Sequence, residues 1–174
     1  LHKRGHKDAV SQAPIRETMA ALFLRQCGYS GTEPVLDPMC GSGTFVIEAA
    51  EIAAGLAPGR NRRFAFEDLA TFDPGAWAVM RMEAAARVTT PALRFHGSDR
   101  DEAAVTMARG NAAKAGVAEI TSFRKCVISE VTPPDGPPGL VIVNPPYGAR
   151  IGDKGRLQSL YRSFGDVMRT RFSG

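Results

Sequence analysis

Short apolar runs alternate along this chain with longer segments in which apolar residues recur every three or four positions. The short runs predict buried strands, and the helical spacing predicts amphipathic helices. Strands that alternate with helices indicate βαβ units, so we expect an α/β domain with a doubly wound, mostly parallel sheet. The predicted strands cover 34–37, 93–99, 119–127 and 140–144, and the predicted helices begin at Pro14 and cover 45–54, 74–88, 102–116 and 157–172.

Two of these elements carry an expectation about burial. Ile15, Met19, Leu22 and Phe23 lie at helical spacing in the first helix, so we expect them to form its buried face. The run at 140–144 is almost continuously apolar, which is typical of a strand covered on both faces. Both elements are therefore expected to contribute to the core.

The whole chain, 1–174, fits one partial domain. Residues 1–33 form a segment and a helix ahead of the first strand, and residues 55–92 form a long insertion before the second strand. Four strands are fewer than a doubly wound sheet usually has, and the chain does not begin with methionine. We therefore expect a piece of a longer protein, with the C-terminal strands outside this fragment.

Composition narrows the possible environments and partners. A net charge of +4 permits a nucleic-acid partner, although an ordinary solvated surface explains it equally well. There is no run of 18 apolar residues and no apolar signal-peptide core, so we expect no membrane partner. The three cysteines form no CxxC pair and the histidines lack zinc-ligand spacing. These features indicate a reduced, cytoplasmic protein without a metal.

A glycine-rich loop, "DPMCGSGT", follows the first predicted strand at Asp37. Glycines at 41 and 43 let the backbone turn sharply and let a ligand approach closely. The loop departs from the dinucleotide fingerprint because position 46 is Val, and no Walker lysine follows it. A ligand without a pyrophosphate fits better, although a plain tight turn is the simpler alternative.

Acids at two strand ends suggest what that ligand is. Asp37 can attract an amino-bearing group, and Asp99, at the end of the second predicted strand, can bond vicinal ribose hydroxyls. S-adenosylmethionine presents both groups. The alternative for Asp99 is a surface acid or a helix cap, but Asp101 is the better candidate for the cap of the next helix.

The stretch "VIVNPPYGAR" ends a predicted buried strand on an amide, two prolines and an aromatic ring. The Asn144 side chain and the Pro145 carbonyl can accept the two N–H groups of a planar amine, which positions it for methyl transfer. The prolines, Pro146 included, fix the backbone, and Tyr147 can stack on a planar substrate. A proline-terminated turn with a packing aromatic is the alternative.

Together, "DPMCGSGT" and "NPPY" resemble the motifs of Rossmann-like S-adenosylmethionine-dependent methyltransferases that modify amino nitrogens. That pair is shared by DNA-adenine, rRNA- and tRNA-guanine and protein-glutamine enzymes. Three further stretches, 1–24, 56–67 and 133–174, resemble THUMP-linked RNA guanine-N2 methyltransferases, and most closely the methyltransferase domain of the bacterial 23S rRNA enzymes.

This resemblance implies N2-methylation of a guanosine in 23S rRNA or its precursor, with S-adenosylmethionine as cofactor and a THUMP module in the full-length chain. Adenine-N6, tRNA guanine-N2 and protein glutamine methylation remain alternatives, as does a non-catalytic RNA-binding module. Where the family usually has an apolar residue beside the adenine, this chain has Arg100, and only Glu130 or Ser129 is placed to reach the adenine amino group. The cofactor residues that the resemblance implies are Asp37, Pro38, Cys40, Gly41, Ser42, Gly43, Thr44, Asp99, Arg100 and Glu130.

Basic residues near these motifs are candidates for contact with RNA phosphates. A loop carries Arg60, Arg62 and Arg63, for which a solubilising role is an equal alternative. The two acids of the helix after the glycine loop, Glu48 and Glu51, are expected on its surface. Cys40 has no partner base, so we expect no cysteine nucleophile, and the histidines receive no catalytic role. The candidate RNA contacts are Arg4, Arg16, Arg62, Arg150 and Lys154.

Overall fold

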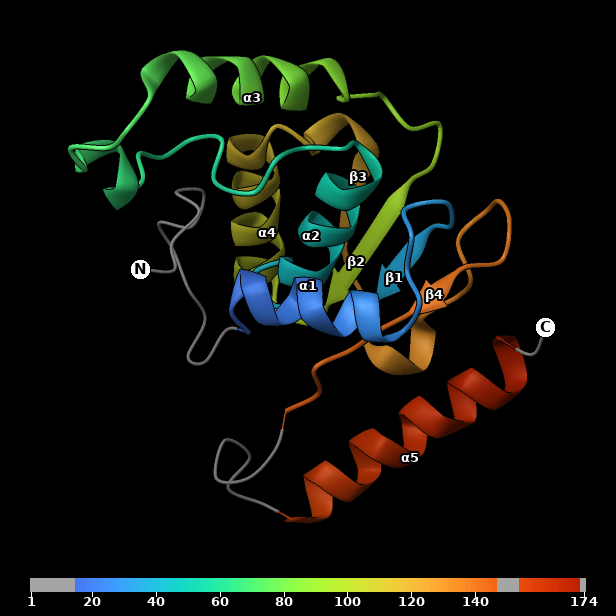
Figure 1. Cartoon of the computed structure of the whole chain (residues 1–174). Coiled ribbons are helices and arrows are strands. Elements are labelled where there is room, and N and C mark those ends of the chain that lie inside the picture. The colour runs from blue at the N-terminus through green and yellow to red at the C-terminus, as the bar shows by residue number, and fades with distance from the viewer. Residues whose placement is uncertain (1–14, 147–153, 173–174) are drawn as a thin grey trace.

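A four-stranded parallel sheet forms the centre of the molecule (Figure 1). The computed structural model describes residues 15–146 and 154–172, with the side chains of Lys154 and Arg156 left out. The strand order is β3-β2-β1-β4, so the chain steps outward from β1 to β3 and then crosses back to the other side of β1. This is the expected doubly wound α/β arrangement. The strands are β1 (Val35–Asp37), β2 (Phe95–Asp99), β3 (Thr121–Lys125) and β4 (Leu140–Val141).

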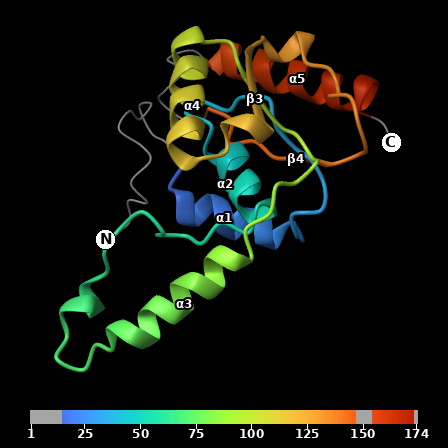
Figure 2. The same ribbon diagram turned by 90° about the horizontal axis from the view of Figure 1, so that it is seen from above.

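Helices cover both faces of the sheet (Figures 1 and 2). Three of them, α1 (Glu17–Gln26), α2 (Thr44–Ala53) and α4 (Glu102–Ala115), lie on one face, and α5 (Lys154–Arg171) lies on the other. Asp101 caps α4 as predicted, since its side chain accepts the Ala103 N–H. None of the helices within the described residues has both the length and the apolar character that crossing a membrane requires. The 3₁₀ turns are η1 (Ala65–Asp68), η2 (Ala118–Ile120) and η3 (Ile128–Glu130).

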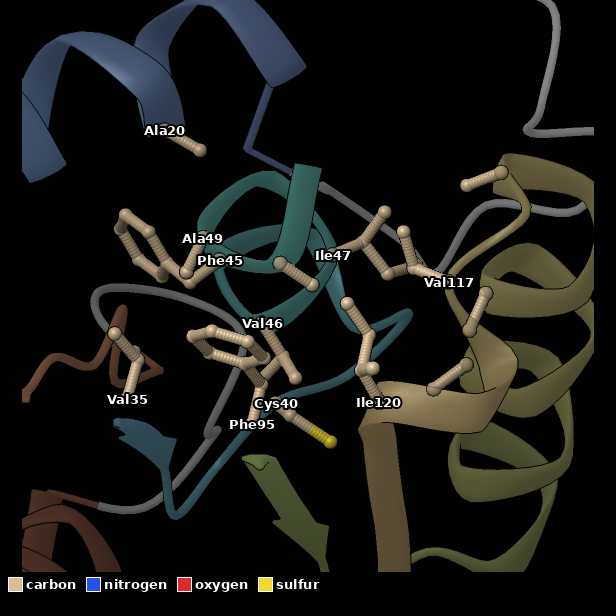
Figure 3. Close-up of a cluster of buried hydrophobic side chains, with 14 of the residues drawn as sticks. Ala20, Val35, Cys40, Phe45, Val46, Ile47, Ala49, Phe95, Val117 and Ile120 are labelled. Atoms are coloured by element: carbon tan, nitrogen blue, oxygen red, sulfur yellow. The ribbon is translucent and has the colours of Figure 1, made fainter. Parts of the chain in front are cut away.

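The main core lies between α2 and the sheet (Figure 3). Ala20 of α1 lies on one side of α2 and Phe95 of β2 on the other, and both are fully buried. Neighbouring residues of β1 serve opposite faces, because strand side chains alternate. Val35 belongs to this core, whereas Leu36 packs with Val167 of α5 in a second cluster. The sheet is therefore fastened to a layer of helices on each side.

The buried face of α1 differs from the predicted one. Ala20 and Leu24 are fully buried, whereas Met19, Leu22 and Phe23 are 40%, 49% and 42% exposed. Ile15, just ahead of the helix, packs against the core as predicted. For the other three residues the prediction was wrong, because the helix carries apolar residues on more than one side and only the packed neighbour selects among them. Here α2 presents a surface rich in alanine, so the small side chain of Ala20 brings the two helices close together.

Two acids expected on the surface of α2 are inside the protein. Glu48 and Glu51 are 1% and 2% exposed, because α1, α4 and the sheet surround their helix. The Arg60 guanidinium lies 2.7 Å from the Glu51 carboxylate and also donates to the carbonyl of Ala115, the last residue of α4. Arg60 therefore ties the segment after α2 to the helical layer, and it is not the free phosphate ligand that its loop position suggested.

The segment 55–92 extends away from the sheet and carries α3 (Pro74–Ala86), close to the predicted helix (Figures 1 and 2). Asp73 caps α3 by accepting the Gly75 and Ala76 N–H groups, yet none of the residues of α3 is buried. The rings of Phe64 and Phe66 lie edge-on to Trp77, at centroid distances of 5.8 and 5.1 Å. The part of this segment from Phe64 to Trp77 is thus held by its own small aromatic cluster.

The last predicted strand is shorter than expected. Only Leu140 and Val141 form β4, because its neighbour β1 has three residues and offers few partners. The Ile142 N–H still donates to the Leu36 carbonyl at 3.0 Å. Backbone pairing therefore ends two residues before Asn144, and the residues from Val143 onward lie beyond the sheet.

Gly97→Ala is expected to destabilise the protein, because an added Cβ would lie 2.6 Å from the buried Phe123 ring and 3.1 Å from the Cβ of Cys40. Such overpacking costs about 1–3 kcal/mol. The matched control is Gly110→Ala within α4, where an added Cβ meets no atom within 4 Å. Alanine favours a helix over glycine by about 1 kcal/mol, so the control should gain stability. Urea denaturation of both variants measures the two changes, and a Gly97→Ala variant as stable as the wild type would contradict the packing.

Candidate active site

Three predicted site residues lie at or just beyond the carboxyl ends of adjacent strands. Asp37 is in register with Gly97, so Asp99 lies two residues beyond its level on β2. On the other side, Leu36 is in register with Val141, and Asn144 follows three residues later. Adjacent strands lie about 4.8 Å apart, and ligands of doubly wound sheets bind where the strand order reverses. The structure therefore brings both sequence motifs to the end of β1 where ligands of such folds bind.

The glycine loop needs its glycines for two separate reasons. Gly41 and Gly43 have φ values of 52° and 82°, in the left-handed region that glycine occupies without strain. In addition, a Cβ on Gly43 would lie 3.0 Å from both the Ala108 Cβ and the Phe123 ring. Gly43 is also the N-cap of α2 and has no side chain to cap its first turn. Backbone N–H groups at the start of α2 are thus placed to receive a ligand.

Hydrogen bonds from distant residues hold the loop in place. The Gly41 N–H donates to Asp99 Oδ2 at 2.9 Å, and the Cys40 N–H donates to the Ser98 carbonyl at 2.9 Å. On the other side, Asn111 of α4 donates from Nδ2 to the Ser42 carbonyl at 3.0 Å. Sequence reasoning missed Asn111, although a signal existed: it is a polar residue on the apolar face of α4.

Asp99 both supports the loop and retains the capacity to bind a ligand. Its Oδ2 accepts the Gly41 N–H, and its Oδ1 accepts the Asp101 N–H at 3.0 Å. A carboxylate has about four acceptor sites, so each oxygen keeps one for a further donor. The half-buried side chain is therefore suited to the predicted ribose contact.

Asp37 is 2% exposed, and its Oδ1 accepts the Met39 N–H at 3.0 Å. Burial raises the pKa of this carboxyl to about 7; the Met39 hydrogen bond opposes the shift and the charge of Asp99 adds to it. A cationic ligand beside such a group favours the ionised form. Asp37 is thus a buried acid whose charge depends on what binds next to it.

Cys40 has the properties of a packing residue. It is 6% exposed, and burial, followed by the nearby charges of Asp37 and Asp99, raises the pKa of its thiol. A thiol with a raised pKa stays protonated near neutral pH, and the thiolate is the reactive form. This agrees with the expectation that Cys40 is not a nucleophile.

The Asn-Pro-Pro turn is anchored at both ends. Asn144, Pro145 and Pro146 are half-buried, and the chain enters the turn from Ile142, which is bonded to β1. At the far end, the Tyr161 hydroxyl of α5 donates to the Pro146 carbonyl at 3.3 Å. Tyr147, the predicted stacking residue, lies outside the described residues.

The other predicted cofactor residues fall into two groups. Pro38, Ser42 and Thr44 are buried within the loop and the first turn of α2. Arg100 is exposed directly after β2, and Glu130 is exposed in η3. The segment before η3 is joined to the site, since the Cys126 N–H donates to the Asp99 carbonyl at 2.9 Å.

The predicted RNA contacts are only partly described. Arg16 is exposed at the N-cap of α1, and the exposed Arg62 lies with its guanidinium 4.3 Å from the centre of the Phe64 ring. Arg4 and Arg150 lie outside the described residues, and Lys154 is the first residue of α5. Within the described part of the chain, no group of three His, Cys, Asp or Glu residues is placed to hold a metal ion.

Comparison with known proteins places the chain in a family. The family described as UPF0020, RMKL-like, methyltransferase domain, matches residues 4–174. The chain is 41% identical over 180 residues to the ribosomal RNA large subunit methyltransferase K/L of Vibrio campbellii, covering 100% of this chain and 26% of that protein. It thus spans about a quarter of the length of that curated relative.

Solved structures agree with the fold. SMU.472, a putative methyltransferase crystallised with S-adenosylhomocysteine, is 34% identical with a TM-score of 0.87, over 97% of this chain and 44% of that one. A protein from Listeria monocytogenes, described as a predicted N6-adenine-specific DNA methylase, is 37% identical with a TM-score of 0.87, over 98% of this chain and 45% of that one.

The resemblance inferred from the two motifs is therefore confirmed, and with it the expected class of S-adenosylmethionine-dependent methyltransferase folds. The chain belongs to the RMKL-like methyltransferase domain family.

Proposed function

We propose that this domain transfers a methyl group from S-adenosylmethionine to the exocyclic N2 amine of a guanosine in 23S rRNA or its precursor. The observation that carries the proposal is that the glycine loop follows β1, is held by Asp99 at the end of the adjacent strand β2, and lies next to the Asn144 turn after β4 on the other side of β1. Ribosomal RNA as acceptor is supported by the name of the Vibrio relative, and guanine N2 by the resemblance of the flanking stretches.

The residues around β1 suit the parts of S-adenosylmethionine. The free acceptor sites of Asp99 suit the two ribose hydroxyls, and the buried Asp37 carboxylate suits the positively charged amino group. Gly41 and Gly43 carry no side chain, so the backbone at these two positions can approach the ligand closely. Arg100 and Glu130 are proposed to flank the adenine.

When bound, the cofactor supplies an electrophilic methyl group on a positively charged sulfur. The Asn144 side-chain carbonyl and the Pro145 backbone carbonyl accept the two N–H groups of the guanine amine. These bonds orient its lone pair toward the methyl group and stabilise the positive charge that develops on nitrogen. The N–C bond forms as the C–S bond breaks and its electron pair stays on sulfur. The amine N–H becomes acidic during this step, so its proton passes to solvent water without a strong base. Tyr147 is proposed to stack on the base.

Five basic residues are proposed to hold the RNA backbone. Arg4, Arg16, Arg62, Arg150 and Lys154 would each neutralise phosphate charge, which makes binding dependent on salt. An RNA-binding THUMP module in the full-length protein is part of the same proposal.

A second candidate acceptor is the N6 amine of adenine. The Listeria relative, described as an N6-adenine-specific DNA methylase, favours it. The two acceptors of the Asn-Pro turn would hold either amine in the same way. Methylation of undermodified rRNA by the full-length protein, followed by mass analysis of the nucleosides, distinguishes N2-methylguanosine from N6-methyladenosine.

Asn144→Ala is expected to lower the rate of methyl transfer by about 10²–10³-fold, because one of the two groups that orient the amine is lost. The dissociation constant for S-adenosylmethionine should change by less than about threefold, since Asn144 is proposed to contact the acceptor only. Asn61→Ala, at an exposed position of the 55–92 segment, is the matched control and should behave as the wild type. Transfer by Asn144→Ala at near wild-type rate would contradict the mechanism.

Cofactor affinity is expected to rise with pH as Asp37 ionises. Because the pKa of Asp37 is raised to about 7, a proton must leave before the carboxylate can pair with the cofactor's amino group. Calorimetry should show proton release below pH ~7 and tighter binding as pH rises from about 5.5 to 7.5. The variant Asp37→Asn should bind more weakly at neutral pH and lose this dependence.

The raised pKa of Asp37 has the opposite effect on the stability of the cofactor-free protein. Its contribution to stability falls as pH rises, whereas cofactor affinity is expected to rise. A raised pKa stabilises the folded state fully below the ordinary Asp value of 3.8, and this contribution is lost as pH rises through about 7. The difference in unfolding free energy between wild type and Asp37→Asn should therefore change across this range, by at most roughly 4 kcal/mol. A difference that does not vary with pH would show that Asp37 does not titrate there.

A further inference from the structure

The Asn-Pro-Pro turn has an unusual hydrogen-bonding problem. Pro145 and Pro146 lack N–H groups, so neither residue can donate a bond that would fix the turn to its surroundings. The proline rings set φ, but the orientation of each carbonyl still depends on ψ. The two prolines can therefore be held only through their carbonyl acceptors, and the donor must come from another residue.

That donor is a tyrosine of α5. The Tyr161 hydroxyl donates to the Pro146 carbonyl at 3.3 Å, across fifteen positions of sequence. This carbonyl belongs to the peptide unit that joins Pro146 to Tyr147. A hydrogen bond to this carbonyl fixes the ψ angle of Pro146. Pro146 directly follows Pro145, whose carbonyl is one of the two proposed acceptors of the guanine amine.

The helix that carries Tyr161 is anchored independently of this bond. Val167 of α5 is 5% exposed and packs with Leu36 of β1 and with Val131. Met168, also of α5, and Val141 of β4 pack against the same cluster. Tyr161 lies six residues before Val167, roughly 9 Å along the helix axis. Strands β1 and β4, which lead into the site, thus also pack against α5, which holds the turn through Tyr161. The same two strands therefore support both the site and the helix.

Resting on the proposed function of Asn144 and Pro145, we infer that Tyr161 is a positioning residue for methyl transfer: its hydroxyl orients the Asn-Pro-Pro turn so that both acceptors face the amine. Tyr161 touches neither the cofactor nor the acceptor in this role. Its removal therefore affects the step in which the amine is oriented, and it leaves the affinities for the two substrates largely unchanged.

The test is Tyr161→Phe in the full-length protein, which keeps the ring and removes only the hydroxyl. A partly exposed hydrogen bond is worth about 0.5–1.5 kcal/mol, so we expect a fall of about three- to tenfold in single-turnover rate. The KM for rRNA, the dissociation constant for S-adenosylmethionine and the Tm should stay close to the wild-type values.

Tyr29→Phe is the matched control. The Tyr29 hydroxyl donates to the Ala49 carbonyl at 2.9 Å inside the core between α1 and α2, away from the turn. Its loss should lower the Tm by a few degrees without lowering the transfer rate. The two variants remove the same group, so they separate a positioning role from a structural one.

A Tyr161→Phe variant with wild-type single-turnover rate overturns the inference, and so does a rate loss that is matched by a fall in Tm of the size seen for Tyr29→Phe. Asn144→Ala, assayed in parallel, separates this failure from that of the proposed function. If Asn144→Ala is inactive while Tyr161→Phe is normal, only the positioning role is wrong. If the wild type methylates another acceptor, the same rate comparison is made on that acceptor.

Discussion

The hydrogen bond from the Gly41 N–H to the Asp99 carboxylate joins the loop after β1 to the end of β2, across 58 positions of sequence. Together with the bond from Cys40 to the Ser98 carbonyl, it fixes the glycine loop against β2. The loop can come this close because Gly97 has no side chain and leaves room for the Phe123 ring and Cys40. The start of α2, the position of the buried Asp37 and the free acceptor sites of Asp99 all depend on this contact.

The site lies where two independent cores meet. The helices α1, α2 and α4 cover one face of the sheet and support the glycine loop, whereas α5 covers the other face and supports the Asn-Pro-Pro turn. Both motifs follow neighbouring strands, so their separation is set by strand spacing. A proposed methyl donor held by one motif and an acceptor held by the other would therefore be brought together by the sheet itself.

Local patterns predicted the ends of β1 and β2 at Asp37 and Asp99, the glycine loop and the cap at Asp101, because each depends on a few adjacent residues. They failed where a distant neighbour decides the outcome. The predicted face of α1 included Met19, which is exposed, and Glu48 was expected on the surface but is buried. Arg60 lies in a basic loop, yet it pairs with a buried acid. In each case the outcome depends on a packing partner from another segment, which the local pattern does not identify.

By itself, the sequence predicted the kind of chemistry, since that prediction rests on two contiguous motifs, the loop at 37–44 and the "NPPY" at 144–147. It also placed the chain in its family through the surrounding stretches. Only the tertiary structure decided how these groups behave. Burial raises the pKa of Asp37. Long-range contacts make Asp99 a support for the glycine loop and bring the Tyr161 hydroxyl to the Pro146 carbonyl. The physical reason is that desolvation and hydrogen-bond partners come from segments far along the chain, which no local pattern specifies.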